Sequence, residues 1–438
     1  MKITLHHLGP IEQADIDLRP LTVFIGRNNT GKTWATNVIA SVFGLPGQKL
    51  YEHTYDANRT IKKIPSLDLL LQQVIDKGEG ELDLLQFATE HGEKYMDDIA
   101  HLAPKLLRNY LKSDHLFKGL EVNLVLGEVK EIFLERIKTF AVVNEQSGTL
   151  SAMRDNSQPI LRIQNKDKSL SPFWVKGFIY DNVFGVIRQA IYRNIYPFPT
   201  ERLAWVVQNF SQLKQSLDGF VDDGHEDYFL GWMVEAATAN DLNKESTKQY
   251  RELAHELEGI LEGKINFVNN DTEFMNQPEK ELRFQINDKL DLEMSAASSM
   301  VQGLSALVIY LRYLAQHGEL IIIDEPEMNL HPEAQVQLME FLAMLVNAGL
   351  HVLITTHSPY MVDHLANLMA AAKSENKAEA SELFFLERTE AFISQDKVSV
   401  YLFENGTATN VVDDDGIIHW GTFGEISNYL SDVYAHLI

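Results

Sequence analysis

Eight consecutive residues near the N-terminus carry glycine, lysine and hydroxyl groups in the spacing of a phosphate-binding loop. The segment fits the pattern G-x-x-x-x-G-K-[ST] and consists of Gly26, Arg27, Asn28, Asn29, Thr30, Gly31, Lys32 and Thr33. In such a loop the backbone N–H groups surround phosphate oxygens, the lysine contacts the outer phosphates and the last hydroxyl can ligate Mg²⁺. These residues therefore predict a nucleotide site with Lys32 on the phosphates and Thr33 on the metal.

Two adjacent carboxylates follow an apolar run much later in the chain. The run 320–323 ends at Asp324 and Glu325. At the end of a buried strand, the first carboxylate can hold Mg²⁺ and the second can orient or deprotonate an attacking water. The two halves of one phosphate-transfer site arise together by accident far less often than either half alone. We expect Asp324 to be a metal ligand and Glu325 to be the catalytic base.

A histidine closes the next apolar run. His357 follows Thr355 and Thr356 and precedes Ser358. A lone histidine is more often structural than catalytic. Its position after the strand expected beside Asp324 and Glu325 nevertheless favours a role in catalysis, with hydrogen bonds to the terminal phosphate and to Glu325.

The elements that must position these residues can be read from apolar periodicity. Residues 21–25 predict a strand and residues 32–43 a helix, so that the phosphate loop lies between them. Residues 320–323 and 351–355 predict two further strands, with a helix over 332–348 between them. Strands that alternate with helices predict an α/β fold with a mainly parallel sheet, whose functional loops lie at the carboxyl ends of the strands.

The middle of the chain has mixed character. Residues 66–117 predict mostly helix with a break at 77–80, and 245–261 predict another helix. Serine-rich residues 295–299 predict the start of a helix that ends at Gly318. Short strands are expected at 265–268, 282–286 and 290–294. The heptad pattern lasts about one heptad, too short for a long coiled coil.

Taken together, the motifs resemble those of ABC-type ATPases of the SMC, RecF and OLD group. The resemblance covers residues 1–44 and about 294–365 and weakens between them. It implies an ABC-ATPase head that binds ATP and Mg²⁺, with a mainly parallel sheet, an N-terminal antiparallel part and a large helix-rich insertion. The implied division is 1–44 for the N-terminal part of the head, 45–290 for the insertion with the remaining lobe strands, and 291–438 for the C-terminal part.

The same resemblance implies assembly into at least a dimer. Asn329, Leu330 and His331 fall in the D-loop, which lies at the dimer interface in this group. Ser298 and Ser299 occupy the place of the signature that binds the terminal phosphate held by the opposite subunit. The pattern departs from the family here, because a methionine stands at position 300 where a glycine is expected.

Two further features match the group less closely. Asn29 stands where many relatives have glycine, and we expect little harm because asparagine tolerates left-handed backbone geometry. Residues 196–202 resemble a Pro-x-x-Arg element of OLD-like defence ATPases. Two alternatives remain open for Arg202. It reaches the nucleotide site or an interface, or it forms a structural salt bridge. No glutamine can be assigned to the Q-loop of the family.

Composition limits the partners. The chain has 438 residues, 38 basic and 62 acidic, for a net charge of −24, and it has no cysteine. Such a balance disfavours binding to nucleic acid and to membranes on average, although it is compatible with a local basic groove. Lys105, Arg108 and Lys112 recur at helical spacing, and we interpret them as a solvated helix face. Without a membrane-spanning run or a signal peptide, we expect a cytoplasmic protein.

The residues leave two functional classes open. The favoured hypothesis is a stand-alone regulatory ATPase that controls a separate effector protein encoded nearby, as in Septu-like and PARIS-like anti-phage systems. The alternative is a RecF-like or SMC-like repair ATPase that binds DNA across its dimer. A nuclease centre at 413–415 is disfavoured because little chain follows it, and the acidic stretch 222–227 is expected to be a loop rather than a metal site.

Overall fold

The computed structural model describes residues 1–57, 61–111, 117, 119–127, 129–139, 144–154, 158–167, 169–200, 202, 233, 236, 246–274, 277–421, 429 and 432–436. The chain divides into two compact units. The first comprises Met1–Gly9 with Asn37–Asn194, and the second comprises Pro10–Thr36 with Ile195–Ile438. The second unit contains the phosphate loop and both later motifs.

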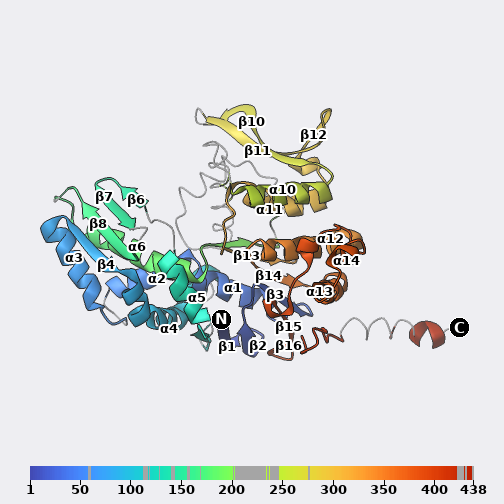
Figure 1. Cartoon of the computed structure of the whole chain (residues 1–438), viewed down its shortest axis with the longest axis horizontal. Helices are drawn as coiled ribbons and strands as arrows, with labels where there is room; N and C mark the ends of the chain where they lie inside the picture. Colours follow the sequence, from blue (N-terminus) through green and yellow to red (C-terminus); the bar gives the residue numbers. More distant parts are fainter. Residues whose placement is uncertain are drawn as a thin grey trace. The chain divides into compact units, whose positions relative to one another are not determined.

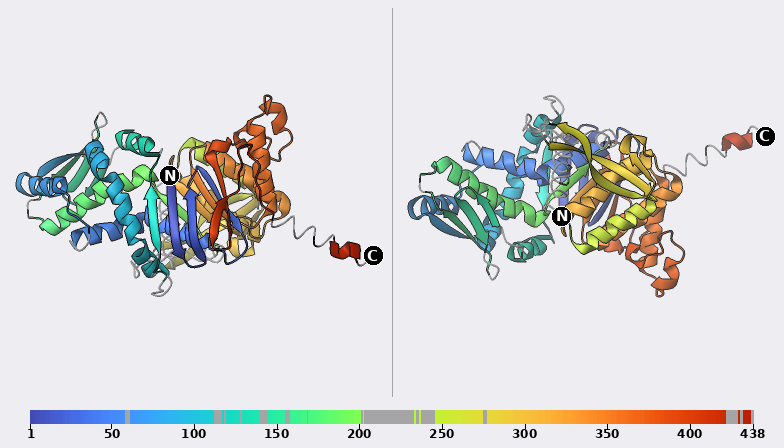
Figure 2. Two further views of the ribbon diagram at one scale, coloured as in Figure 1. Left: turned by 90° about the horizontal axis from the view of Figure 1, so that it is seen from below. Right: turned by 90° about the horizontal axis from the view of Figure 1, so that it is seen from above.

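The second unit is built on a mainly parallel sheet, as predicted. The strands lie in the order β2 (Ile11–Asp17), β16 (Thr407–Asn410), β15 (Val398–Glu404), β3 (Leu21–Gly26), β14 (His351–Thr356), β13 (Leu320–Asp324) and β9 (Ile195–Phe198). From β15 to β9 all neighbours are parallel, and β16 returns antiparallel to β15. In Figure 2 the red C-terminal strands lie beside the blue N-terminal ones, so both ends of the chain build one sheet.

The central strands are apolar because helices cover them. Residues 320–323 of β13 are all buried, which is the continuous apolar pattern of a strand covered on both faces. Three helices accompany these strands, namely α11 (Ser299–Tyr313), α12 (Pro332–Asn347) and α13 (Pro359–Ala372). Each begins with a capping side chain, from Ser298, His331 and Ser358 respectively. The prediction that the first of these helices continues to Gly318 is wrong, because it ends at Tyr313.

A small antiparallel sheet completes the second unit. It consists of β10 (Lys264–Phe274), β11 (Gln277–Asn287) and β12 (Leu290–Glu293). The three strands predicted there are confirmed, but β10 and β11 extend well beyond the predicted 265–268 and 282–286. Helix α10 (Lys248–Ile260) packs against α11, and the buried residues of both belong to the same core as β13. Figure 1 shows these two helices between the small sheet and β13.

The first unit combines helices with its own strands. Its helices are α2 (Leu45–Asp56), α3 (Pro65–Lys77), α4 (Leu84–Leu111), α5 (Val129–Thr139) and α6 (Pro172–Ile191). A four-stranded sheet has the order β4 (Glu79–Asp83), β8 (Ile160–Asn165), β7 (Leu150–Arg154) and β6 (Asn144–Ser147), and β1 (Lys2–Leu8) pairs antiparallel with β5 (Glu121–Val125). The predicted helix break is confirmed, since α3 ends before Gly78 (φ 86°) and β4 follows. The four-stranded sheet itself was not predicted.

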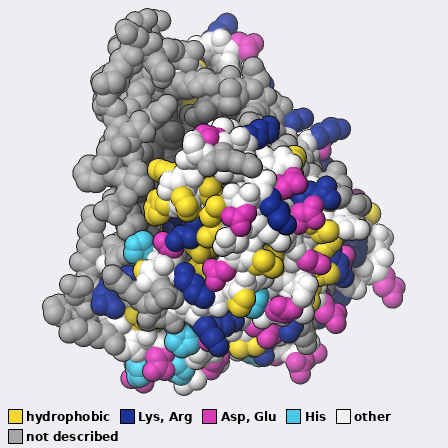
Figure 3. Space-filling model, turned by 90° about the vertical axis from the view of Figure 1, so that its left-hand side faces the viewer, with side chains coloured by type: hydrophobic (Ala, Val, Ile, Leu, Met, Phe, Trp, Pro, Cys, Tyr) yellow, Lys and Arg dark blue, Asp and Glu magenta, His cyan; other side chains and the backbone are white. Residues whose placement is uncertain are grey.

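The surface carries mixed charge. Figure 3 shows lysine and arginine side chains interspersed with aspartate and glutamate on the face that it presents. On α4, Lys105 and Arg108 are exposed while Leu106 and Leu107 are buried, which confirms the solvated helix face; Lys112 lies outside the described residues. Among the helices of the described ranges, none combines the length and the apolar character needed to cross a membrane.

Candidate nucleotide site

The loop after β3 depends on its two glycines. Gly26 has φ 136° and Gly31 has φ 104°, both in the region that favours glycine. A Cβ on Gly26 would lie 2.4 Å from the carbonyl oxygen of Phe403, and one on Gly31 would lie 2.5 Å from Cγ1 of Ile11. Asn29, at φ 63°, adopts the left-handed geometry expected of it. The loop therefore packs closely against β15 and β2, and α1 (Lys32–Phe43) begins at its last residues.

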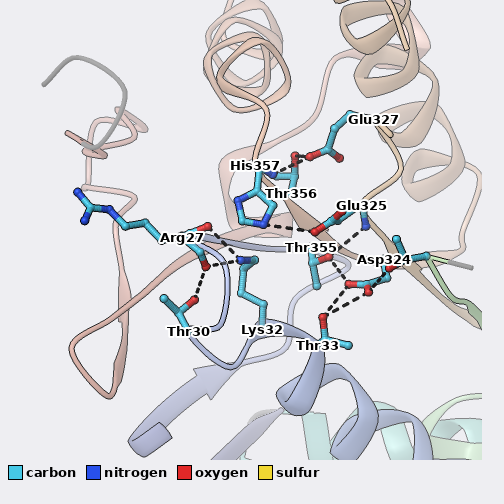
Figure 4. A network of polar contacts seen from close by, with 12 residues as sticks. Arg27, Thr30, Lys32, Thr33, Asp324, Glu325, Glu327, Thr355, Thr356 and His357 are labelled. Carbon is cyan, nitrogen blue, oxygen red and sulfur yellow. Dashed lines mark hydrogen bonds and ion pairs between the residues drawn. The ribbon is translucent and has the colours of Figure 1, made fainter. Parts of the chain in front are cut away.

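Lys32 is folded into this loop. Its ammonium donates hydrogen bonds to the carbonyl oxygens of Gly26 and Arg27, at 3.0 and 2.9 Å, and the residue is 5% exposed. Thr30 also donates to the Arg27 carbonyl, at 2.9 Å, so the loop closes on itself (Figure 4). Burial lowers the pKa of Lys32, and the nearby Glu325 carboxylate opposes this shift. A positive group at the mouth of a helix N-terminus can bind phosphate oxygens.

Three threonine hydroxyls surround the Asp324 carboxylate. Thr33 lies 3.2 Å from its Oδ1 and 3.3 Å from its Oδ2. Thr200 donates to Oδ2 at 2.5 Å, and Thr355 donates to Oδ1. Hydroxyl and carboxylate oxygens are suitable ligands for Mg²⁺, which usually keeps several waters and takes few protein ligands. Thr33 and Asp324 therefore lie close enough together to hold one magnesium ion between them.

Glu325 follows β13 in an unusual backbone conformation. Its φ is 46°, and its N–H donates to the carbonyl oxygen and to the hydroxyl of Thr355, both at 3.1 Å. Its carboxylate oxygen lies 3.3 Å from Nε2 of His357 (Figure 4). Burial raises the pKa of Glu325, and the neighbouring Asp324 and Glu327 add to the rise. A carboxylate of raised pKa is a better proton acceptor than an ordinary one.

The histidine loop is held by another carboxylate. Oε1 of Glu327 accepts from the Thr356 hydroxyl at 2.7 Å and from the His357 N–H at 2.6 Å. Burial raises the pKa of Glu327. Burial lowers the pKa of His357, and Lys32 lowers it further, so a neutral imidazole is favoured at pH 7. Glu327 thus fixes the loop that presents His357 to Glu325.

The structure also shows contacts that the sequence did not reveal. Thr200, Thr355 and Glu327 received no role from the sequence. Thr200 follows β9 and Thr355 lies near the end of β14. Functional side chains gather at the carboxyl ends of parallel strands, so these positions could have indicated both threonines. Arg202 reaches the site, which was one of its two predicted alternatives. Its guanidinium donates to the backbone carbonyls of Asp324 and Glu325 at 2.8 and 3.2 Å.

The signature serines lie at the start of α11. The Ser298 hydroxyl accepts the Val301 N–H at 3.3 Å and so caps the helix, and both Ser298 and Ser299 are exposed. Met300 packs against the core. In the D-loop, Asn329 is exposed at φ 64°, Leu330 is buried and His331 caps α12. The hydroxyl of Ser298 is therefore engaged in the cap of α11.

The other acidic candidates give no second centre in the described residues. Asp413 accepts the N–H groups of Asp415 and Ile417, at 3.0 and 2.8 Å, so the triplet forms a turn. The acidic stretch 222–227 lies outside the described residues. Within the described ranges, no three or more histidine, aspartate and glutamate side chains gather as a metal site.

Comparison with known proteins points in the same direction. The model of the AAA ATPase domain family matches residues 209–362. The Old nuclease of Escherichia phage P2 is 44% identical over 80 residues, which cover 16% of this chain and 14% of that protein. The chain thus spans only a small part of this curated relative.

Similar solved structures include heads of SMC proteins. One is an SmcHead bound to the C-winged helix domain of ScpA, with a TM-score of 0.39 at 10% identity, covering 94% of this chain and 96% of that one. Another is the SMC head domain from Thermotoga maritima, with a TM-score of 0.32 at 9% identity, covering 94% and 97%. The matched ATPase domain, the partial likeness to the Old nuclease and the phosphate loop beside the β13 carboxylates support an ATPase of the SMC- and OLD-like type.

Proposed function

We propose that this chain is a stand-alone regulatory ATPase, which binds ATP with Mg²⁺, hydrolyses it slowly and assembles on ATP to control a separate effector protein in anti-phage defence. The observation that supports this most is the meeting of three parallel strand ends. The loop after β3 carries Lys32, β13 ends in Asp324 with Glu325 behind it, and His357 follows β14.

Substrate binding falls to the loop and its lysine. The backbone N–H groups of residues 26–33 and the N-terminus of α1 surround the phosphates, and the Lys32 ammonium exchanges its carbonyl partners for phosphate oxygens. Thr33 and Asp324 hold Mg²⁺, which when bound neutralises phosphate charge and orients the substrate. The short Thr33 to Asp324 distance supports this assignment.

Hydrolysis falls to Glu325 and His357. Glu325 orients a water and accepts its proton while the water oxygen bonds to the terminal phosphorus and the bond to the leaving ADP oxygen breaks. His357, 3.3 Å from Glu325, donates a hydrogen bond to the terminal phosphate from its neutral ring. The lowered pKa of His357 supports a neutral donor here.

Assembly places a second head over the nucleotide. Ser299 at the exposed start of α11 contacts the terminal phosphate bound by the other subunit, and Asn329 lies in the interface. ATP then favours the closed dimer and hydrolysis releases it, so an effector that binds one arrangement is held or freed with the nucleotide state. The net charge of −24 and the mixed charge in Figure 3 support a protein partner rather than DNA.

Recovery of a partner from the native host tests this proposal. Tagged wild type, Lys32→Ala and Glu325→Gln chains are purified with and without ATP. We expect a protein encoded beside this chain to be recovered in a nucleotide-dependent way, and to be lost with Lys32→Ala. The effector proposal is wrong if no partner is recovered and the purified chain degrades nucleic acid in a Mg²⁺-dependent reaction that survives Lys32→Ala. Recovery of DNA by the closed dimer would instead favour the RecF-like alternative.

A further inference from the structure

Arg202 is a buried guanidinium that contacts three separate segments of the second unit. It is 2% exposed. Its Nη1 donates to the carbonyl oxygens of Pro199 and Asp324, at 3.0 and 2.8 Å, and its Nη2 donates to that of Glu325 at 3.2 Å. Its Nε donates to the carbonyl oxygen of Gly303, inside α11, at 3.0 Å. One side chain therefore joins the turn after β9, the end of β13 and helix α11.

The contact with Glu325 matters because of the backbone conformation there. A glutamate at φ 46° lies in the left-handed region, which residues with a side chain adopt only when their surroundings hold them in it. Thr355 holds the N–H side of this residue, and Arg202 holds its carbonyl side. The direction of the Glu325 carboxylate, toward His357, depends on that backbone conformation.

The same turn also orients the neighbouring aspartate. Thr200 donates to Oδ2 of Asp324 at 2.5 Å, while Arg202 binds the backbone carbonyl of the same residue. The turn thus fixes both the side chain and the main chain of Asp324. No such contact is predicted by spacing, because more than a hundred residues separate the turn from β13.

We infer that Arg202 is a positioning residue for ATP hydrolysis, which holds the peptide of Glu325 in its left-handed conformation and ties it to α11. The inference rests on the proposed hydrolytic role of Glu325. Arg202 donates to main-chain carbonyls of α11 and β13, whereas Lys32 lies in the phosphate loop itself. Its loss should therefore affect turnover more than nucleotide binding.

The experiment compares Arg202→Ala, Arg202→Lys and wild type for kcat, KM and the affinity for a non-hydrolysable ATP analogue. We expect Arg202→Ala to lower kcat by about tenfold to a hundredfold, the range for a small misplacement of a reacting group, with analogue affinity within about threefold of wild type. Millimolar guanidinium should restore part of the kcat. The kcat of Arg202→Lys should lie between those of Arg202→Ala and wild type, since an ammonium cannot reproduce the planar set of hydrogen bonds.

Arg154 provides the matched control. It is also buried, at 6% exposed, and donates to the carbonyl oxygens of Ile137 and Lys138. All three residues belong to the first unit, whereas Arg202 belongs to the second. Arg154→Ala should lose thermal stability without losing kcat per folded molecule, and guanidinium should not raise its kcat. Equal losses of kcat in the two alanine variants would show that Arg202 is merely structural and would overturn the inference.

A double-mutant cycle separates this inference from the function on which it rests. In the Glu325→Gln background, Arg202→Ala should lower the residual rate by less than about threefold, because residues that act as a unit are not additive. A full further loss in that background would overturn the positioning role while leaving hydrolysis by Glu325 intact. A wild-type chain without ATPase activity would instead overturn the proposed function itself. If Arg202→Ala does not fold, Arg202→Lys carries both comparisons.

Discussion

The Thr33 hydroxyl lies 3.2 Å from Oδ1 of Asp324, although 291 residues separate the two in the chain. The contact exists because β3 and β13 flank β14 in parallel, so their carboxyl ends meet at one edge of the sheet. Residues near the two ends of the chain thereby form one site.

Replacing Lys32 with alanine should abolish nucleotide binding. The buried ammonium is the positive group folded into the loop, and without it the phosphate charge is not compensated there. Calorimetry with a non-hydrolysable ATP analogue measures the loss. Lys289→Ala, at an exposed turn between β11 and β12, is the control and should bind as wild type does. Equal affinity of Lys32→Ala and wild type would refute the assignment of the loop.

The concentration of Mg²⁺ needed for ATP hydrolysis should rise when either oxygen ligand is lost. Thr33→Val removes the hydroxyl and Asp324→Asn removes the carboxylate charge, so both variants should need at least about tenfold more Mg²⁺ for half-maximal ATPase activity, the loss typical of a disturbed metal site. EDTA should stop the wild-type reaction. A Mg²⁺ titration of the rate measures both effects. Thr409→Val, exposed on β16, is the control. Unchanged Mg²⁺ curves in both site variants would exclude this pair as the metal site.

The sequence predicted the elements that carry the motifs closely. The helix over 32–43 and the strands at 320 and 351 follow from apolar periodicity and capping residues, which are local signals. Asp324, Glu325 and His357 could be brought together because parallel strand ends share an edge. The four-stranded sheet of the first unit was missed, because its strands have only four to six residues and an alternating pattern that short is a weak signal in the sequence.

The supporting residues of the site could not be predicted for a different reason. Arg202 binds the main-chain carbonyl of Asp324, a contact that needs no particular residue at the partner position, and Thr200 binds the Asp324 carboxylate across 124 positions of sequence. Glu327 binds the Thr356 hydroxyl and a main-chain N–H across a loop. These contacts are set by tertiary packing, so no spacing in the sequence indicates them.

Glu52 should make the first unit less stable as pH rises. Its carboxyl is largely buried beside Gln48 and Lys49, and burial raises its pKa to about 7. The unfolded chain loses this proton near pH 4.5, so the free energy of unfolding should fall between about pH 4.5 and 7, by at most on the order of 3 kcal/mol. Glu52→Gln removes the titration. Its melting temperature relative to wild type should therefore increase from pH 5.5 to pH 8.

The exposed Glu93 provides the control for this series. Glu93→Gln should shift the melting temperature by a similar small amount at both pH values, since its side chain is 68% exposed. Calorimetry or circular dichroism at the two pH values measures the differences. A Glu52→Gln variant whose melting temperature relative to wild type does not change with pH would contradict the buried-carboxyl account.

ATP should drive dimerisation through the start of α11. In a Glu325→Gln chain, light scattering should show a dimer with ATP and a monomer without it. Adding Ser299→Arg should block the dimer, because a large cation replaces a small hydroxyl at an exposed helix start where the partner's nucleotide is expected. Thr409→Arg in the same background is the control and should still dimerise. A Glu325→Gln chain that stays monomeric at saturating ATP would contradict the sandwich.

The rate of ATP hydrolysis by wild type and by Glu325→Gln tests the central claim most directly. The substitution keeps the shape of the side chain but removes its capacity to accept a proton, while Lys32 and Thr33 still bind the substrate. We predict slow but measurable Mg²⁺-dependent release of phosphate by wild type, at least about a hundredfold less by Glu325→Gln, and equal affinity of both chains for the ATP analogue. Equal rates of hydrolysis in the two chains would show that Glu325 is not the catalytic base and that the site does not work as described.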